Sequence, residues 1–176
     1  MSALVPFVAQ PGVASSRRDF ARRLLTGALA AGALSLPPAA RADTPLPAAR
    51  ELRADARSAA ARGQPLVLMF SLPGCSYCEQ LRRSTYRWLV RDGIPVQQLE
   101  MVADYRLTGF DGKPTDGAAL AAHYGVHLAP TVLFLGPDGH EIGERLVGAG
   151  VPDFYGAFVD RSLNQARERL KAGNGR

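Results

Sequence analysis

The hydrophobic pattern of residues 43–176 predicts that helices and strands alternate along the chain. The continuous apolar run from Leu66 to Phe70 is typical of a strand that is buried on both faces. Apolar residues at helical spacing predict helices before and after this run. In the first half we expect a loose tail at 43–47, a helix at 48–62, a strand at 65–71, a helix at 76–91 and a strand at 96–102. A loop at 104–116 and a short helix at 117–124 follow. The last part contains strands at 131–135 and 141–147, joined by a turn at 137–139, and a helix at 152–170.

Glycine and proline residues mark several boundaries of these elements. Gly63 and Gly93 follow the first two predicted helices, where glycine commonly ends a helix. Pro152 lies in the first turn of the last helix, a position that tolerates proline. Two glycines and a proline favour a loop insertion at 104–116. The length of 176 residues is enough for one domain but too short for two domains with a full hydrophobic core each.

Residues 1–42 differ in composition from the rest and resemble an export signal. Arginines at positions 17, 18, 22 and 23 precede a mildly apolar run at 24–36. This run has the length of a signal-peptide core and is shorter than the roughly 20 residues that a membrane-spanning helix needs. The sequence from Ala40 to Ala42 provides the small-x-small pattern of a signal-peptidase site. We therefore expect cleavage after Ala42; an uncleaved anchor or an ordinary amphipathic helix is the alternative.

The stretch from Ser16 to Phe20 refines the prediction of export. It reads S-R-R-x-F and resembles the twin-arginine signal, in which an apolar residue and often a lysine follow. Ala21 and Arg22 stand at these two places, so the match is incomplete. The twin-arginine route carries folded proteins, and general secretion of an unfolded chain is the alternative. We expect the exported domain to be located in the periplasm.

The net charge of +5 belongs mostly to this leader. The whole chain has 21 basic and 16 acidic residues, a balance that invites a nucleic-acid-binding interpretation. The leader alone holds five arginines and one aspartate, so residues 43–176 carry 16 basic and 15 acidic residues. No basic block remains in them. We therefore predict neither a nucleic-acid partner nor a polybasic membrane surface for the mature domain.

The two cysteines, Cys75 and Cys78, lie where the buried strand is followed by a helix. The N–H groups and the dipole at a helix N-terminus favour a thiolate, which is the nucleophilic form of cysteine. Two intervening residues on the first helical turn let the two sulfur atoms meet. Cys75 can therefore attack a substrate disulfide, and Cys78 can resolve the mixed disulfide that forms.

Two other interpretations of the cysteines stay open on spacing alone. A structural disulfide that closes a four-residue loop contributes only roughly 2 kcal/mol in the chain-entropy model, less than longer loops give. A metal site, for example a copper carrier, could use Cys75, Cys78 and His127. His123 and His127 have the spacing of zinc-finger ligands, but no second CxxC motif accompanies them. The spacing favours redox chemistry over both alternatives.

Three separated motifs together resemble the thioredoxin superfamily between residues 65 and 170. They are the apolar strand followed by Cys75-x-x-Cys78, the Y-G-V-x-x-x-P-T segment from Tyr124 to Thr131, and the stretch from Arg145 to Ala149 that ends in V-G-A. The resemblance implies an α/β thioredoxin fold: a central four-stranded mixed sheet flanked by helices, with an N-terminal helix and the CxxC pair at a strand–helix junction. The implied domain spans 65–171, after a tail and helix at 43–64 and before a flexible tail at 172–176.

The resemblance also implies which residues surround the cysteines. A cis bond between Ala129 and Pro130 would face the cysteines, so that Ala129, Pro130 and Thr131 position the substrate main chain. Gly148 would keep the substrate groove open. No small-molecule cofactor is implied, because the redox group is the disulfide itself.

Two departures from thioredoxin bear on proton transfer to and from Cys78. Thioredoxin has a buried aspartate six positions before the first cysteine and a tryptophan directly before it; Met69 and Gly74 stand at these positions. Another group must then exchange protons with Cys78. Glu100 on the next strand and His127 near Pro130 are the candidates. The alternative is that Glu100 is an ordinary solvated glutamate and that His127 is a surface histidine with no role in the reaction.

The sequence around the cysteines resembles periplasmic thioredoxin-like proteins. Tyr77, the aromatic residue before the second cysteine, is shared with the catalytic domains of disulfide isomerases. The 22 residues at 43–64 are too few for an isomerase dimerisation domain, and the loop at 104–116 is too short for the helical insertion of the oxidases. We therefore expect a monomeric periplasmic disulfide reductase that acts on protein disulfides and exchanges electrons with a membrane thiol–disulfide partner.

Overall fold

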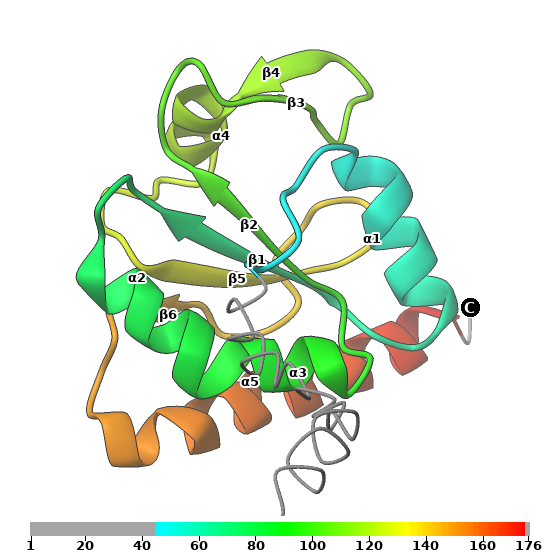
Figure 1. Ribbon diagram of the computed structural model, residues 1–176. Helices are drawn as coiled ribbons and strands as arrows, with labels where there is room; N and C mark the ends of the chain where they lie inside the picture. The colour runs from blue at the N-terminus through cyan, green and yellow to red at the C-terminus, as the bar shows by residue number, and fades with distance from the viewer. Residues whose placement is uncertain (1–44, 175–176) are drawn as a thin grey trace, which may run out of the picture. The chain divides into compact units, whose positions relative to one another are not determined.

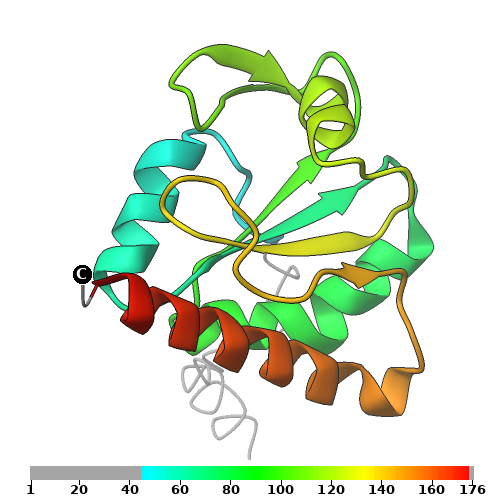
Figure 2. The same ribbon diagram turned by 180° about the vertical axis from the view of Figure 1, so that it is seen from behind.

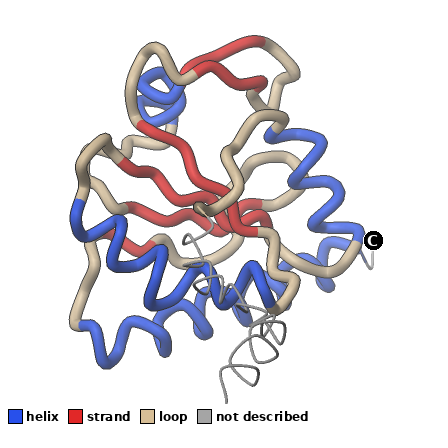
Figure 3. Tube along the Cα trace, viewed as in Figure 1, coloured by secondary structure: helices blue, strands red, loops and turns tan. Residues whose placement is uncertain are grey.

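A four-stranded mixed sheet forms the centre of the computed structural model, which describes residues 45–174 (Figures 1 and 3). The strands lie in the order β2-β1-β5-β6. Their bounds are β1 (Leu66–Ser71), β2 (Val96–Glu100), β5 (Thr131–Leu135) and β6 (Leu146–Val147). β1 pairs in parallel with β2 and antiparallel with β5, and β5 pairs antiparallel with β6. The predicted fold class, an α/β domain around a four-stranded mixed sheet, is confirmed.

Helices cover both faces of this sheet (Figure 2). They are α1 (Leu52–Ala61), α2 (Ser76–Leu81), the π-helical turn η1 (Arg82–Tyr86), α3 (Arg87–Arg91), α4 (Gly117–His123) and α5 (Pro152–Asn174). The segments α2, η1 and α3 follow one another without a break, so the helix predicted at 76–91 is present with one wider turn inside it. None of the helices in residues 45–174 has the length and apolar content to cross a membrane.

The central strand β1 is buried along its whole length because both of its faces pack against helices. Leu66, Leu68 and Phe70 join the cluster that contains α1 and α4, whereas Val67 and Met69 join the cluster that contains α2 and α5. Successive side chains of a strand point to opposite faces, which produces this division. Each large apolar side chain buried in this way contributes about 1.5–3 kcal/mol. The continuous apolar run is therefore explained by the two-sided core.

The N-terminal segment corrects two predictions. Residues 46 and 47 are not a loose tail: Leu46 is buried, and the carbonyl oxygen of Pro47 accepts a hydrogen bond of 2.9 Å from the backbone N–H of Gln98. The helix predicted at 48–62 begins at Leu52, because the backbone N–H of Ala49 donates to the carbonyl oxygen of Gln98 at 2.8 Å. The chain before α1 is thus extended along the edge of β2.

The segment at 104–116 is a two-stranded hairpin and not a loop. β3 (Arg106–Thr108) pairs antiparallel with β4 (Pro114–Asp116). Tertiary contacts support these short strands: the N–H of Thr108 donates to the carbonyl oxygen of Arg50 at 2.7 Å, and the Arg53 side chain donates to the carbonyl oxygen of Phe110. The hairpin therefore depends on the segment around the start of α1.

Two further boundaries differ from the predictions. Only Leu146–Val147 of the strand predicted at 141–147 is regular, apart from a bridge between Leu135 and Glu141. In the irregular part Gly143 lies between α5 and β5; an added Cβ would be 2.7 Å from the carbonyl oxygen of Ser162 and 2.8 Å from Phe134 Cβ. At the other end, α5 continues to Asn174, so the tail predicted to be flexible from residue 172 is helical at 172–174.

Candidate active site

Cys75 and Cys78 form a disulfide at the N-terminus of α2, with their Cα atoms 5.3 Å apart. Cys75 is the N-cap residue, and its Sγ accepts a hydrogen bond of 3.2 Å from the backbone N–H of Cys78. The helix continues through η1 and α3, so the positive end of its dipole lies at these sulfur atoms. The strand–helix junction therefore gives Cys75 the surroundings that favour a thiolate.

The two sulfur-bearing residues differ in their access to solvent. Cys75 is partly buried, whereas Cys78 has no exposed surface and belongs to the core cluster between the sheet and α5. A molecule that approaches from solvent therefore meets Cys75 first. Cys78 can react with Cys75 but is shielded from external groups.

The loop before β5 lies next to the cysteines. Thr131, the first residue of β5, pairs with Phe70, and the loop that leads to Cys75 begins two residues after Phe70, at Leu72. Ala129 and Cys75 pack against the same buried cluster. The Ala129–Pro130 peptide bond is cis, and the Thr131 hydroxyl donates to the carbonyl oxygen of Leu128 at 2.7 Å.

Gly148 borders this loop. Its backbone N–H donates to the carbonyl oxygen of Pro130 at 2.7 Å, so the two residues are in contact. Gly148 has a φ of +77°, and no atom lies within 4 Å of the place where a Cβ would stand. The position therefore requires glycine for its backbone and leaves open space beside Pro130.

A family model of the thioredoxin-like domain matches residues 52–159, which is more than half of the chain. The chain belongs to the thioredoxin superfamily. The superfamily and the CxxC disulfide together make the protein a thioredoxin-like thiol–disulfide oxidoreductase. Thioredoxin-like proteins act on protein disulfides, so protein disulfides are the general kind of partner.

Solved structures of thioredoxins are similar to this chain. Poplar thioredoxin h, PtTrxh4, is 18% identical and has a TM-score of 0.45, over 64% of this chain and 94% of its own. Thioredoxin NaTrxh of Nicotiana alata is 17% identical, with a TM-score of 0.43 over 65% of this chain and 95% of its own. The periplasmic thioredoxin SoxS of Paracoccus pantotrophus is 25% identical, with a TM-score of 0.40 over 57% and 96%. Comparison with curated protein sequences finds no match.

Exposed apolar side chains flank the CxxC pair of this thioredoxin-like domain. Leu72 precedes the cysteines, Tyr77 lies between them, Leu128 precedes the cis peptide bond, and Val147 pairs with Thr131 in the edge strand β6. Their exposed fractions range from 41% to 63%. Apolar side chains gathered at a reactive group are typical of a protein-binding surface.

The two candidates for proton transfer are placed differently. Glu100 is the last residue of β2 and pairs with Ser71, so it lies beside the CxxC loop, where it is partly buried. His127 is an exposed residue of the loop before β5. Met69 occupies the position of thioredoxin's buried aspartate and is itself fully buried. In the described residues no three His, Cys, Asp or Glu side chains are grouped to hold a metal ion, so Cys75, Cys78 and His127 do not form such a set.

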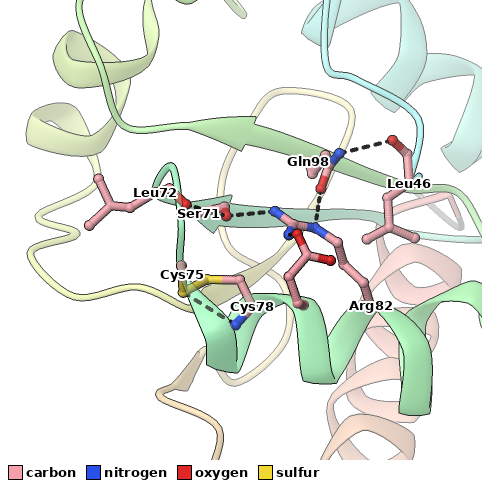
Figure 4. Close-up of polar contacts among 8 residues, drawn as sticks. Leu46, Ser71, Leu72, Cys75, Cys78, Arg82 and Gln98 are labelled. Atoms are coloured by element: carbon pink, nitrogen blue, oxygen red, sulfur yellow. Dashed lines mark hydrogen bonds and ion pairs between the residues drawn. A yellow bond between two sulfur atoms is a disulfide. The ribbon is translucent and has the colours of Figure 1, made fainter. Parts of the chain in front are cut away.

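Arg82 is a charged residue beside the cysteines that the sequence motifs did not single out (Figure 4). Its side chain is only 14% exposed and donates to Ser71 Oγ at 2.6 Å and to Gln98 Oε1 at 2.5 Å, and it pairs with the carboxylate of Glu79. A signal was present: Arg82 follows Cys75 by seven residues and Cys78 by four, which is the spacing of one helix face. Because arginine is rarely buried without a partner, an arginine on the buried face of a helix indicates a specific interaction.

Proposed function

We propose that the protein is a periplasmic protein-disulfide reductase in which Cys75 attacks and Cys78 resolves. The observation that carries this proposal is the unequal burial of the two cysteines at one helix N-terminus: Cys75 is partly exposed and Cys78 is fully buried. A structural disulfide has no need for this inequality. The protein would need no small-molecule cofactor, because the cysteine pair itself carries the two electrons.

The reaction would run in two exchanges. The Cys75 thiolate attacks one sulfur of the substrate disulfide, a mixed disulfide forms, and the other substrate sulfur leaves as a thiolate that takes a proton from water. The Cys78 thiolate, whose proton has gone to solvent, then attacks Cys75 Sγ. The second substrate sulfur leaves as a thiolate and is protonated in turn. The protein ends as the Cys75–Cys78 disulfide and the substrate as a dithiol.

The loop at 129–131 would hold the substrate during these exchanges. Its contact with Gly148 and its position next to the CxxC loop support this role for Ala129, Pro130 and Thr131. The open space at Gly148 would admit an extended substrate chain. Tyr77, at 63% exposure between the two cysteines, would contact the substrate as well.

The exposed apolar residues around the site support a folded or partly folded protein as the substrate. The protein would act as a monomer and receive electrons from a membrane thiol–disulfide donor that reduces the Cys75–Cys78 disulfide. Glu100, which lies beside the CxxC loop, would assist the proton transfers; His127, an exposed residue, is the weaker candidate.

The leader supports the periplasmic location. Residues 1–42 would direct export by the twin-arginine route and would be removed after Ala42. N-terminal sequencing of protein from the periplasmic fraction should give Asp43 as the first residue. Changing both Arg17 and Arg18 to Lys should keep the precursor in the cytoplasm, whereas a protein that still reaches the periplasm would follow the general secretion route.

Trapping tests the assigned roles of the cysteines. A Cys78→Ser variant expressed in the cell envelope should accumulate mixed disulfides through Cys75, and reduction should release the trapped proteins. A Cys75→Ser variant is the matched control and should trap none of them. Equal trapping by both variants, or none by Cys78→Ser, would contradict the assignment.

The redox potential tests the proposed direction. Equilibration of the purified protein with glutathione should give a potential near that of thioredoxin, about −270 mV. A value near −120 mV, which is typical of a strong oxidase, would overturn the reductase assignment while leaving the exchange chemistry in place.

A further inference from the structure

Arg82 reaches the strand that lies beside the position of thioredoxin's aspartate. Met69, which occupies that position, pairs with Gln98 of β2. Paired residues of neighbouring strands project to the same face of a sheet. Met69 packs in the cluster that contains Cys78, so this is the face that carries the CxxC helix. The Gln98 side chain accepts its hydrogen bond from Arg82 Nε on this face.

Three contacts fix the Arg82 guanidinium between the CxxC helix and the sheet. It is bound to Ser71 at the end of β1, to Gln98 in β2 and to Glu79 in the first turn of α2. Gln98 is itself held, because its Nε2 donates to the carbonyl oxygen of Leu46 at 3.1 Å. Figure 4 shows the guanidinium above the first turn of α2, which carries the disulfide. The charge is therefore mostly buried, held by three contacts and on the sheet side of the cysteines.

We propose that Arg82 is a positioning residue whose fixed positive charge favours the thiolate of Cys78 over the thiol. This inference rests on the proposed exchange reaction. The step that benefits is resolution: Cys78 releases its proton to water, its thiolate attacks Cys75 Sγ, the bond between Cys75 and the substrate sulfur breaks, and the substrate leaves as a thiolate. Arg82 gains and loses no proton, because a guanidinium stays protonated in proteins.

This mechanism differs from the transfer of a proton to a buried carboxylate. A nearby positive charge stabilises an anion, and the interaction is stronger where water is excluded. The charge also stabilises the reduced form of the pair, since only the reduced form contains a thiolate. Reduced-form stabilisation makes a thiol pair more oxidising, so Arg82 raises the redox potential of this protein.

Other charged and titratable groups surround Arg82 and the cysteines. Glu79 pairs with Arg82 and weakens its effect. Glu100, Arg83 and Arg87 line a pocket of about 210 Å³ together with Arg82 and Gly74. On the far side, the buried tyrosines Tyr86 and Tyr155 lie in the cluster of Cys78, and Asp153 of α5 faces α2 across a second pocket.

Equilibration with glutathione tests the charge of Arg82. An Arg82→Gln variant keeps hydrogen-bond donors but removes the charge, and its reduced form should be disfavoured about tenfold, which corresponds to a potential about 30 mV more negative. Arg82→Lys should keep most of the wild-type equilibrium. Glu79→Gln removes the opposing charge and should shift the equilibrium the other way. Arg167→Gln is the matched control, because Arg167 is partly buried on α5 and bound to Gln64 and Asn164.

A titration separates this role from a purely structural one. In a Cys75→Ala background the single thiol is Cys78, and thiolate absorbance against pH reports its ionisation. Arg82→Gln in this background should move the midpoint about one pH unit upward. If Arg82→Gln lowers only the unfolding free energy and changes neither the midpoint nor the glutathione equilibrium, the proposal is wrong. Should Arg82→Gln fail to fold, the opposite shift expected for Glu79→Gln decides the same question.

A failure of this inference can be distinguished from a failure of the proposed function. Failure of Cys78→Ser to trap any partner would reject the exchange reaction, and the Arg82 variants would be irrelevant to it. A Cys78→Ser variant that traps partners, combined with Arg82 variants that leave the equilibrium and the midpoint unchanged, would reject the inference about Arg82 alone.

Discussion

Two tyrosine hydroxyl groups meet in the core beneath the CxxC helix. The Tyr86 and Tyr155 oxygens are 2.8 Å apart, and both residues are almost completely buried. A Tyr155→Phe variant leaves the Tyr86 hydroxyl without this partner, so the free energy of unfolding should fall by about 1–3 kcal/mol. The Tyr86→Phe/Tyr155→Phe double variant should lose less than the sum of the two single variants, as measured by urea unfolding. Strict additivity would contradict the pairing.

The same pair predicts how stability depends on pH. Burial raises the pKa of Tyr155 to about 12 and that of Tyr86 well above its ordinary value of 10.0. Above about pH 10 the unfolded chain therefore holds fewer protons than the folded protein. Unfolding becomes easier as the pH rises from about 10 to 12, and this loss should be smaller in the double variant. An equal pH dependence in both proteins would show that other groups cause it.

Gly148 offers a test of the substrate groove at the level of one residue. Gly148→Leu places a side chain into the open space beside Pro130 and forces a non-glycine residue into a φ of +77°. Gly63→Leu is the matched control, because Gly63 has a φ of +69°, equally open surroundings, and lies before β1, at the end away from Cys75. Both variants should lose about 1–2 kcal/mol of stability.

Only Gly148→Leu should raise the KM for a protein disulfide. A small aromatic disulfide, which needs little of the groove, should react with both variants at nearly the wild-type rate. If the Gly63 and Gly148 variants have the same KM for the protein substrate, Gly148 does not border the groove.

At the level of elements, the sequence predicts those parts of the fold whose burial is visible in their own residues. β1 follows from its apolar run, and the helix after Cys75 follows from its periodicity. The hairpin β3–β4 does not, because its strands have three residues each and are supported by Arg50 and Arg53 far away in sequence. The irregular segment before β6 likewise contains a close contact, between Gly143 and α5. The pattern of neighbouring residues in the sequence does not predict such long-range contacts.

Gly117 at the start of α4 is a second such contact, and it makes a prediction. A Cβ on Gly117 would stand 1.8 Å from the carbonyl oxygen of Glu100, so Gly117→Ala must displace backbone at the end of β2. The expected loss is about 1–3 kcal/mol or more. Gly156→Ala is the control, since Gly156 lies inside α5 with open space around it and should gain about 1 kcal/mol. Thermal unfolding of both variants measures the contrast; a stabilised Gly117→Ala protein would contradict the packing of α4 on β2.

At the level of the whole molecule, the site is built from segments that the chain brings together from several places. The cysteine pair and the loop of Pro130 were predictable, because each is marked by a short motif of neighbouring residues. For Arg82 only its position on the helix face of the cysteines was predictable; its contacts were not, because they involve Ser71, Gln98 and Glu79 together. Gln98 in turn depends on Leu46, so the N-terminal segment supports the surroundings of the cysteines.

This connection predicts how far the N-terminus can be shortened. Leu46 is buried, and Pro47 and Ala49 exchange backbone hydrogen bonds with Gln98. A chain that begins at Asp43, the residue after the proposed cleavage site, keeps all of these contacts and should unfold at the same urea concentration as the full chain. A chain that begins at Leu52 loses the buried leucine and these bonds, so its free energy of unfolding should fall by at least about 2 kcal/mol.

The truncation should also change the redox equilibrium. Without Leu46 the Gln98 amide loses an anchor, so the Arg82 guanidinium is held less firmly on the sheet side of the cysteines. The glutathione equilibrium of the chain from Leu52 should therefore move in the direction expected for Arg82→Gln, whereas the chain from Asp43 keeps the equilibrium of the full protein. If the chain from Leu52 loses stability without this shift, the N-terminal segment has only a structural role. If the chain from Asp43 is also less stable than the full chain, the leader itself contributes essential contacts.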